Sequence, residues 1–96
     1  METRIPTYAK RRNPRLTDQD ISWIWHNLDL SQPDEWEVYD HHDHCAEMGF
    51  CYHFHGVDVY VDGFCSREPW RGPEDITHAY LVDSLGRQYP IDIKSK

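Results

Sequence analysis

An amphipathic helix is predicted near the start of the chain. Its apolar residues recur at positions i, i+3, i+4 and i+7, the spacing of one buried helical stripe: Ile21, Ile24, Trp25 and Leu28. Thr17 has the residue type of a helix N-cap, and Asp20 stands where the acid of a capping box belongs. The turn-forming run Ser31-Gln32-Pro33-Asp34 ends the helix.

Trp23 falls outside that stripe. At 100° per residue it points about 200° away from Ile21, towards the other side of the helix. A surface tryptophan is a frequent anchor in protein interfaces, whereas a neighbouring loop that covers it would make it part of the core. The sequence leaves both interpretations open, and Trp23 is one of the expected partner-binding residues.

From Phe50 onward the period of the pattern becomes two, which predicts a β-hairpin with its turn at His55-Gly56. With that turn, three apolar pairs face each other on one side: Phe54 with Val57, Tyr52 with Val59, and Phe50 with Val61. The other side then carries polar and mixed side chains: Cys51, His53, Asp58, Tyr60 and Asp62. The agreement of register and hydrophobicity across both strands supports the pairing.

A second hairpin is predicted over residues 77–93. It runs from Thr77 to Asp83, turns over Ser84-Leu85-Gly86, and returns from Arg87 to Ile93. Pro90 has no N–H for a ladder, so this last strand is expected at an edge of the sheet.

Residues 34–48 are ambiguous, because Asp34-Glu35 can begin a helix, while Trp36 and Val38 alternate with acids as in a strand. We therefore predict an α+β domain, with one N-terminal helix packed on a small antiparallel sheet of about four strands, formed by two hairpins.

The charge of the chain is divided unevenly. The 96 residues suffice for one domain, and the net charge is −7. Residues 1–16 contain five basic residues against one acid, together with Pro6 and Pro14, and are predicted to form a basic extended arm. Residues 17–96 carry five basic residues against sixteen acids and are predicted to form a single acidic domain. This composition excludes a large enzyme with a deep cavity and a generally basic nucleic-acid binder.

No Lys or Arg occurs from Leu16 to Ser66, a stretch that holds eleven acids. Such a field repels nucleic-acid phosphate and attracts basic protein surfaces. Direct binding to nucleic acid is therefore not expected. A solvated acidic face that maintains solubility is the alternative.

The cysteines and the apolar runs bear on location. Three cysteines, an odd number, argue against a closed disulfide framework and fit a reducing cytosol. The N-terminus lacks the apolar region of a secretory signal, and the longest apolar run, residues 79–82, is far too short to cross a membrane. We expect a cytoplasmic location and no membrane partner.

The loop of residues 66–74 is the strongest candidate for partner binding. Arg67, Trp70 and Arg71 are residue types that dominate interface hot spots, and Pro69 stiffens the loop, which lowers the entropy lost on docking. The alternative is a connecting loop whose Trp70 folds back on the core. An exposed Glu68-Pro69 bond also makes Pro69 a possible target of a host prolyl isomerase, since X-Pro bonds exchange slowly between isomers.

Zinc binding is the alternative function. Three cysteines and five histidines lie within residues 41–65, and thiolate and imidazole are preferred zinc ligands. Cys51 and His53 share a predicted strand face, and Cys65 could return near them. No Cys-x2-Cys pair occurs, however, so we assign no metal ligand and no cofactor. The expected pair of His53 and Asp58 is more typical of a local hydrogen bond than of a catalytic centre, and we assign no catalytic residue.

The size, the acidity, the tryptophan-rich helix and the segment Ser66-Arg67-Glu68-Pro69-Trp70-Arg71 together resemble the anti-RecBCD proteins of lambdoid phages. The resemblance concerns the chain as a whole, and no functional residue is transferred from it. It implies a phage protein that binds the RecC subunit of the host RecBCD helicase–nuclease and redirects that nuclease during DNA recombination. The expected function is thus non-catalytic binding and modulation of a host DNA-processing enzyme in the host cytoplasm.

Overall fold

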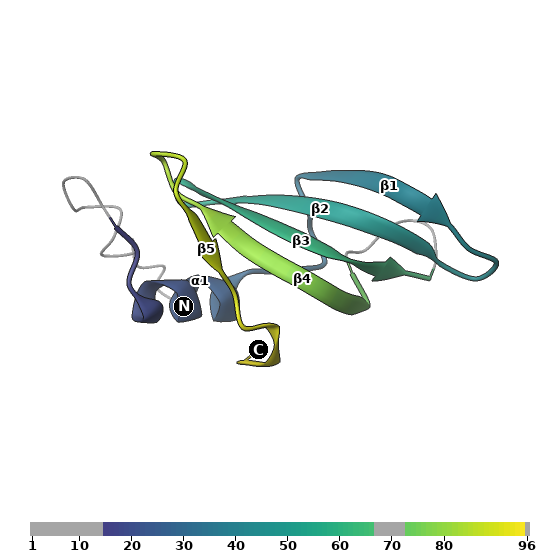
Figure 1. Cartoon of the computed structure of the whole chain (residues 1–96), viewed down its shortest axis with the longest axis horizontal. Coiled ribbons are helices and arrows are strands. Elements are labelled where there is room, and N and C mark those ends of the chain that lie inside the picture. The colour runs from purple at the N-terminus through teal and green to yellow at the C-terminus, as the bar shows by residue number, and fades with distance from the viewer. Residues whose placement is uncertain (1–14, 67–72, 96) are drawn as a thin grey trace.

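The computed structural model describes residues 15–66 and 73–95. One helix, α1 (Asp18–Asn27), precedes five strands: β1 (Glu35–His41), β2 (Ala46–Phe54), β3 (Val57–Cys65), β4 (Asp75–Val82) and β5 (Gln88–Pro90). A short 3-10 turn, η2 (Ile93–Ser95), follows. The strands form one antiparallel sheet in chain order, and α1 lies along one side of it (Figure 1). The α+β class is confirmed. The expected count of about four strands is corrected to five, because the ambiguous segment forms the edge strand β1.

The predicted helix start is confirmed in detail. The Asp20 backbone N–H donates to the Thr17 hydroxyl at 3.2 Å, and the Thr17 backbone N–H donates to the Asp20 carboxylate at 2.8 Å. This reciprocal pair satisfies two N–H groups that no helical carbonyl reaches. Ile24 and Trp25 are fully buried, as the apolar stripe predicted.

The first hairpin has the predicted turn and register. Phe54 pairs with Val57, and Phe50 pairs with Val61. His55 and Gly56 both have positive φ angles, 49° and 82°, as a two-residue type I′ turn requires. Such a turn matches the right-handed twist of the strands that it joins, so the local sequence and the sheet agree.

The second hairpin is shorter than predicted. Its last strand ends at Pro90 and continues into η2 instead of running on to Ile93. The edge position of Pro90 is confirmed, since β5 is an outer strand. The turn is organised by the buried Asp83 carboxylate, which accepts hydrogen bonds from the backbone N–H groups of Leu85 and Arg87, the Arg87 Nε–H and the Tyr89 hydroxyl.

Two hydrogen bonds attach the helical segment to the sheet. The Leu16 backbone N–H donates to the Tyr89 hydroxyl at 3.3 Å, and the Tyr52 hydroxyl donates to the Leu30 carbonyl at 2.7 Å. Leu16 is itself buried, so the last residue of the expected arm belongs to the core. Residues 1–14 of that arm lie outside the described residues. No helix among the described residues is long and apolar enough to cross a membrane.

The core lies between α1 and one face of the sheet. The side chains that fill it come from the helix, its flanks and the inward positions of four strands: Leu16, Ile24, Trp25, Leu28, Ala46, Met48, Phe50, Tyr52, Val57, Val59, Val61, Cys65, Ala79, Leu81 and Tyr89. Because strand side chains alternate between faces, the intervening residues of β2, β3 and β4 project from the opposite face. This second face, called the open face below, carries the candidate site.

Candidate functional site

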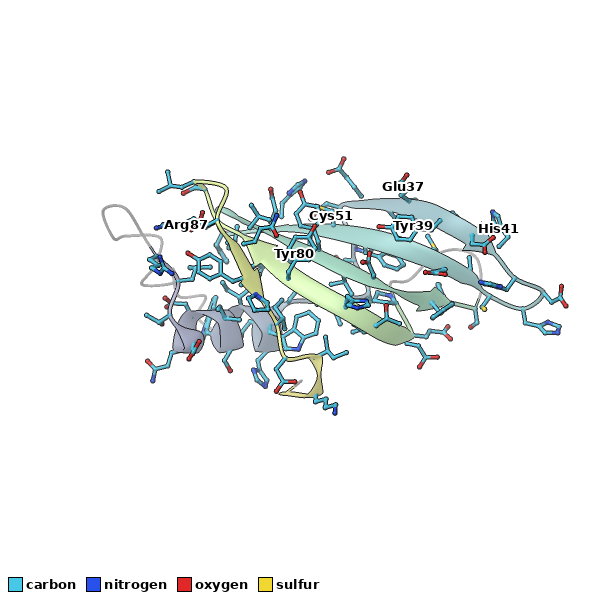
Figure 2. The ribbon with its side chains drawn as sticks, in the orientation of Figure 1. Glu37, Tyr39, His41, Cys51, Tyr80 and Arg87 are labelled. Carbon is cyan, nitrogen blue, oxygen red and sulfur yellow. The ribbon has the colours of Figure 1, made fainter. Side chains whose placement is uncertain are left out.

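A groove of about 460 Å³ lies on the open face. Its lining comes from four strands: Glu35, Trp36, Glu37, Tyr39, Gly49, Phe50, Cys51, Tyr60, Asp62 and Tyr80. Figure 2 labels four of these side chains, Glu37, Tyr39, Cys51 and Tyr80, on the part of the sheet away from α1. The groove therefore lies opposite the helix, on a rigid surface of paired strands.

The open face is strongly acidic. The strand registers place seven carboxylates on it: six from residues 16–66, which are Glu35, Glu37, Asp40, Glu47, Asp58 and Asp62, and also Asp75 of β4. Strands β1 to β4 contain no Lys or Arg. The sequence showed that acids predominate in this part of the chain, and the sheet gathers more than half of that stretch's carboxylates on one side. Such an arrangement produces a negative field over the groove.

Three tyrosines give the groove an aromatic surface. The rings of Tyr60 and Tyr80 stack, with centroids 5.1 Å apart and an interplanar angle of 18°. Tyr39 reaches across β2, and its hydroxyl donates to Asp62 at 3.0 Å. Burial, and then the hydrogen bond to the Asp62 carboxylate, raises the pKa of Tyr39 to about 12. Tyr39 and Tyr60 therefore stand beside the carboxylates of Asp62 and Asp58, and Tyr80 stacks on Tyr60.

Gly49 allows the Tyr39 side chain to cross over β2. A Cβ atom at position 49 would overlap the Tyr39 hydroxyl and ring. Tyr39 is also the extra residue of a β-bulge, since Val38 pairs with Met48 and Asp40 pairs with Glu47. Bulges redirect a side chain relative to the regular alternation, and here the bulge allows Tyr39 to lie over its neighbouring strand.

A polar cluster adjoins the groove at the start of β1. Glu35 pairs with Cys51 across β1 and β2, and His53 pairs with Asp58 across β2 and β3. His53 Nδ1 lies 2.7 Å from Asp58 Oδ1, and its Nε2 lies 3.2 Å from Glu35 Oε2. The hydrogen bond to Asp58 raises the pKa of His53. Burial, followed by the charges of Asp58 and Glu35, raises the pKa of the Cys51 thiol. A raised thiol pKa does not favour a cysteine nucleophile.

Of the predicted partner-binding residues, Trp23 is the one within the described part of the chain. Arg67, Pro69, Trp70 and Arg71 lie outside the described residues. The loop that holds them starts and ends at one end of β3, where the Ser66 hydroxyl donates to Glu74 at 2.6 Å. Trp23 lies at the other end of the nine-residue β3, roughly 25 Å away along the strand.

The burial of Trp23 lies between the two predicted alternatives, a surface anchor and a residue of the core. Its ring contacts Phe54 and His55 of the β2–β3 turn, with centroid distances of 5.8 and 6.4 Å, and 37% of the residue remains exposed. It is thus packed on the hairpin while presenting an exposed edge.

The cysteines do not form one group. Cys65 is buried on the helix-facing side of β3 and pairs with Ala46, whereas Cys51 points to the open face and pairs with Tyr60. The expectation that Cys65 returns near Cys51 is therefore wrong, because the two residues differ in strand face and in register. All three cysteines lie within the described residues, and none of them forms a disulfide bond.

Sequence reasoning missed three residues that the site uses. Glu35 belongs to the segment whose secondary structure the sequence left ambiguous. If that segment is taken as a strand, the alternation with Trp36 places Glu35 on the polar face. The position of Tyr39 over β2 depends on a β-bulge, and no local feature of the sequence predicts that bulge. Tyr80 reaches the groove because β4 pairs with β3, which puts it beside Tyr60.

The chain was compared with known proteins at three levels. No protein-family model matches it, and searches of curated proteins and of solved structures found no match either.

Proposed function

We propose that this protein is a non-catalytic binding protein whose open face docks on a basic surface of a partner protein. The observation that carries the proposal is the groove itself, in which stacked and crossing tyrosines are surrounded by carboxylates on strands that lack Lys and Arg. A partner rich in Lys and Arg complements this face in charge.

The residue types suit docking for two physical reasons. Carboxylates on one face attract a basic partner over several ångströms and raise the association rate. Tyrosine contributes a large contact area at low entropic cost, and its ring binds the cationic head of Arg or Lys. Because Tyr39, Tyr60 and Tyr80 lie on paired strands, little ordering is required when the partner binds.

The partner that we propose is a host DNA-processing enzyme, whose basic DNA-binding surface matches the open face. The resemblance to anti-RecBCD proteins makes RecBCD, through its RecC subunit, the first partner to test. In this proposal the protein is a phage-type modulator, and the exposed edge of Trp23 and the residues expected from the loop, Arg67 to Arg71, add contacts outside the groove.

The test is a binding measurement with purified RecBCD on a biosensor surface at two salt concentrations. Glu37→Gln removes one negative charge from the groove, and Gln19→Lys changes the net charge equally on the exposed surface of α1. We expect Glu37→Gln to slow association by about threefold and to weaken its salt dependence, whereas Gln19→Lys has a smaller effect.

Two results would overturn parts of this proposal. Equal effects of the two variants would show that overall charge, and not the groove, governs binding. Absence of binding by the wild-type protein would exclude RecBCD as the partner, and competition experiments with DNA would then be run on other basic DNA-processing enzymes.

A further inference from the structure

We propose that Glu35, Cys51 and His53 form a zinc-binding site at the edge of the open face. Their ligand atoms, a carboxylate oxygen, Sγ and an imidazole nitrogen, all lie within 4.8 Å of one another. The three residues come from two adjacent strands, and two of them, Glu35 and Cys51, also line one end of the groove.

The backbone holds the three residues in register. Glu35 lies directly opposite Cys51, and His53 follows two residues later on the same face of β2. Asp34, the residue before Glu35, adds two hydrogen bonds to β2 at the end of the β1–β2 pairing. Its backbone N–H donates to the Cys51 carbonyl at 2.9 Å, and its carboxylate accepts from the His53 backbone N–H at 2.6 Å. The ligands are thus attached to strands whose ends cannot slide without breaking these bonds.

The donor set favours zinc. Thiolate, imidazole and carboxylate are the three ligand types of protein zinc sites, whereas Ca²⁺ and Mg²⁺ prefer oxygen alone. Zinc bond lengths of about 2.0–2.3 Å place tetrahedral ligand atoms roughly 3.5 Å apart. Rotation of Glu35, an exposed side chain, brings its carboxylate towards that separation while the His53–Asp58 contact stays in place.

Asp58 supplies the supporting contact that a zinc-bound histidine uses. Its carboxylate lies 2.7 Å from His53 Nδ1, so Nδ1 carries the proton and Nε2 is directed towards Glu35. A carboxylate on the far nitrogen of a histidine ligand orients the ring and increases its basicity. By sequence, the pair of His53 and Asp58 is typical of a local hydrogen bond. In this proposal the same contact orients His53 as a zinc ligand.

Coordination would be three protein ligands with one further position for water. Binding replaces the Cys51 thiol proton with the metal, and that proton passes to the solvent, while the neutral His53 ring binds through the lone pair of Nε2 and keeps its proton on Nδ1. Cys65 and Cys45 take no part, because Cys65 lies on the buried face and Cys45 lies at the far end of β2, beyond Ala46.

The experiment is a titration of the reduced, metal-free protein with Co²⁺ and then with Zn²⁺. Cobalt bound by a thiolate produces a sulfur-to-metal absorption band in the near ultraviolet, which zinc abolishes when it displaces cobalt. We expect one equivalent to bind at micromolar concentration. Cys51→Ser should remove the band, and His53→Ala or Asp58→Asn should weaken zinc affinity by about 10- to 100-fold in calorimetry.

Glu35→Gln removes the third ligand and should also weaken zinc affinity, and each of the three ligand variants has a matched control. Cys45→Ser controls for Cys51→Ser as loss of a thiol, His78→Ala controls for His53→Ala as loss of an exposed histidine on the open face, and Glu37→Gln controls for Glu35→Gln on β1. These controls should leave the affinity unchanged. Near-ultraviolet circular dichroism confirms that each variant is folded.

The inference fails if the absorption band persists in folded Cys51→Ser, or if wild-type protein binds no stoichiometric metal at micromolar concentration. It also fails if His78→Ala weakens binding as much as His53→Ala, because the metal would then bind the acidic face without a defined site.

Discussion

The carboxylate of Asp83 accepts a hydrogen bond from the Tyr89 hydroxyl at 2.8 Å, and this contact joins the turn of the second hairpin to the edge strand β5. The same hydroxyl accepts a bond from the Leu16 backbone N–H, where the chain enters α1. One buried carboxylate therefore organises a turn and, through Tyr89, the attachment of the helix.

Replacing Asp83 should destabilise the fold. Asp83→Asn substitutes an N–H₂ group for one acceptor oxygen, so some of the four donors around it lose their partner. Because the carboxylate and the Tyr89 hydroxyl lie in buried residues, we expect a loss of about 2–3 kcal/mol, measured by urea unfolding. Tyr89→Phe removes one of the four donors to the carboxylate, together with the hydroxyl link to Leu16, and leaves the other three donors in place. Its cost should therefore be smaller than that of Asp83→Asn. Equal costs for the two variants would contradict the central role of the carboxylate.

The pKa of Asp83 predicts how the stability of the fold depends on pH. Burial alone would raise the pKa of Asp83, but the hydrogen bonds from Tyr89, Arg87 and Leu85 lower it from 3.8 to about 2. Between these values the unfolded chain binds more protons than the folded chain. The stabilisation is therefore complete above about pH 4 and is lost as the pH falls through 2. Urea unfolding from pH 5 to pH 2 should show a shallower loss for Asp83→Asn than for the wild type.

Gly49→Ala should disturb the groove through Tyr39. The new Cβ would occupy the space of the Tyr39 ring and hydroxyl, so the side chain must move away from Asp62. We expect a stability loss of about 1–2 kcal/mol, and the pKa of Tyr39, followed by NMR, should fall from about 12 towards 10.0. In a Tyr39→Ala background the same glycine substitution should cost much less, and an unchanged cost would show that the clash lies elsewhere.

The two tryptophans of α1 should behave differently. Trp25 is fully buried, so Trp25→Ala should cost about 3–5 kcal/mol, since a large cavity remains. Trp23 keeps an exposed edge and packs on Phe54 and His55, so Trp23→Ala should cost about 1 kcal/mol. Thermal unfolding by circular dichroism measures both. A Trp23 variant as unstable as the Trp25 variant would assign Trp23 to the core and remove it from the partner-binding residues.

Much of the local architecture was predictable because it depends on neighbouring residues. The capping box needs only Thr17 and Asp20, and the helix stripe needs only its own period. The β2–β3 register follows from the two-residue turn at His55-Gly56, which leaves one pairing that buries Phe50, Tyr52 and their partners. In each case the favourable contacts lie within a few residues or across a single turn.

The candidate site could be predicted only in part. Placing His53 opposite Asp58 followed from the hairpin register and is confirmed at 2.7 Å. Grouping Cys51 with Glu35 required knowing that the ambiguous segment pairs with β2, a contact between residues sixteen positions apart. The expected return of Cys65 failed because the alternation of β3 turns that thiol into the core.

By itself, the sequence determined the helix with its cap, the central hairpin, the edge position of Pro90 and the excess of acids, since each depends on composition or on short-range spacing. Only the tertiary structure decided that residues 35–41 form a strand, that Tyr39 crosses over Gly49 to Asp62, and that Glu35, Cys51 and His53 meet. These features depend on which strands become neighbours, and those contacts join residues too far apart in the chain for local spacing to reveal them.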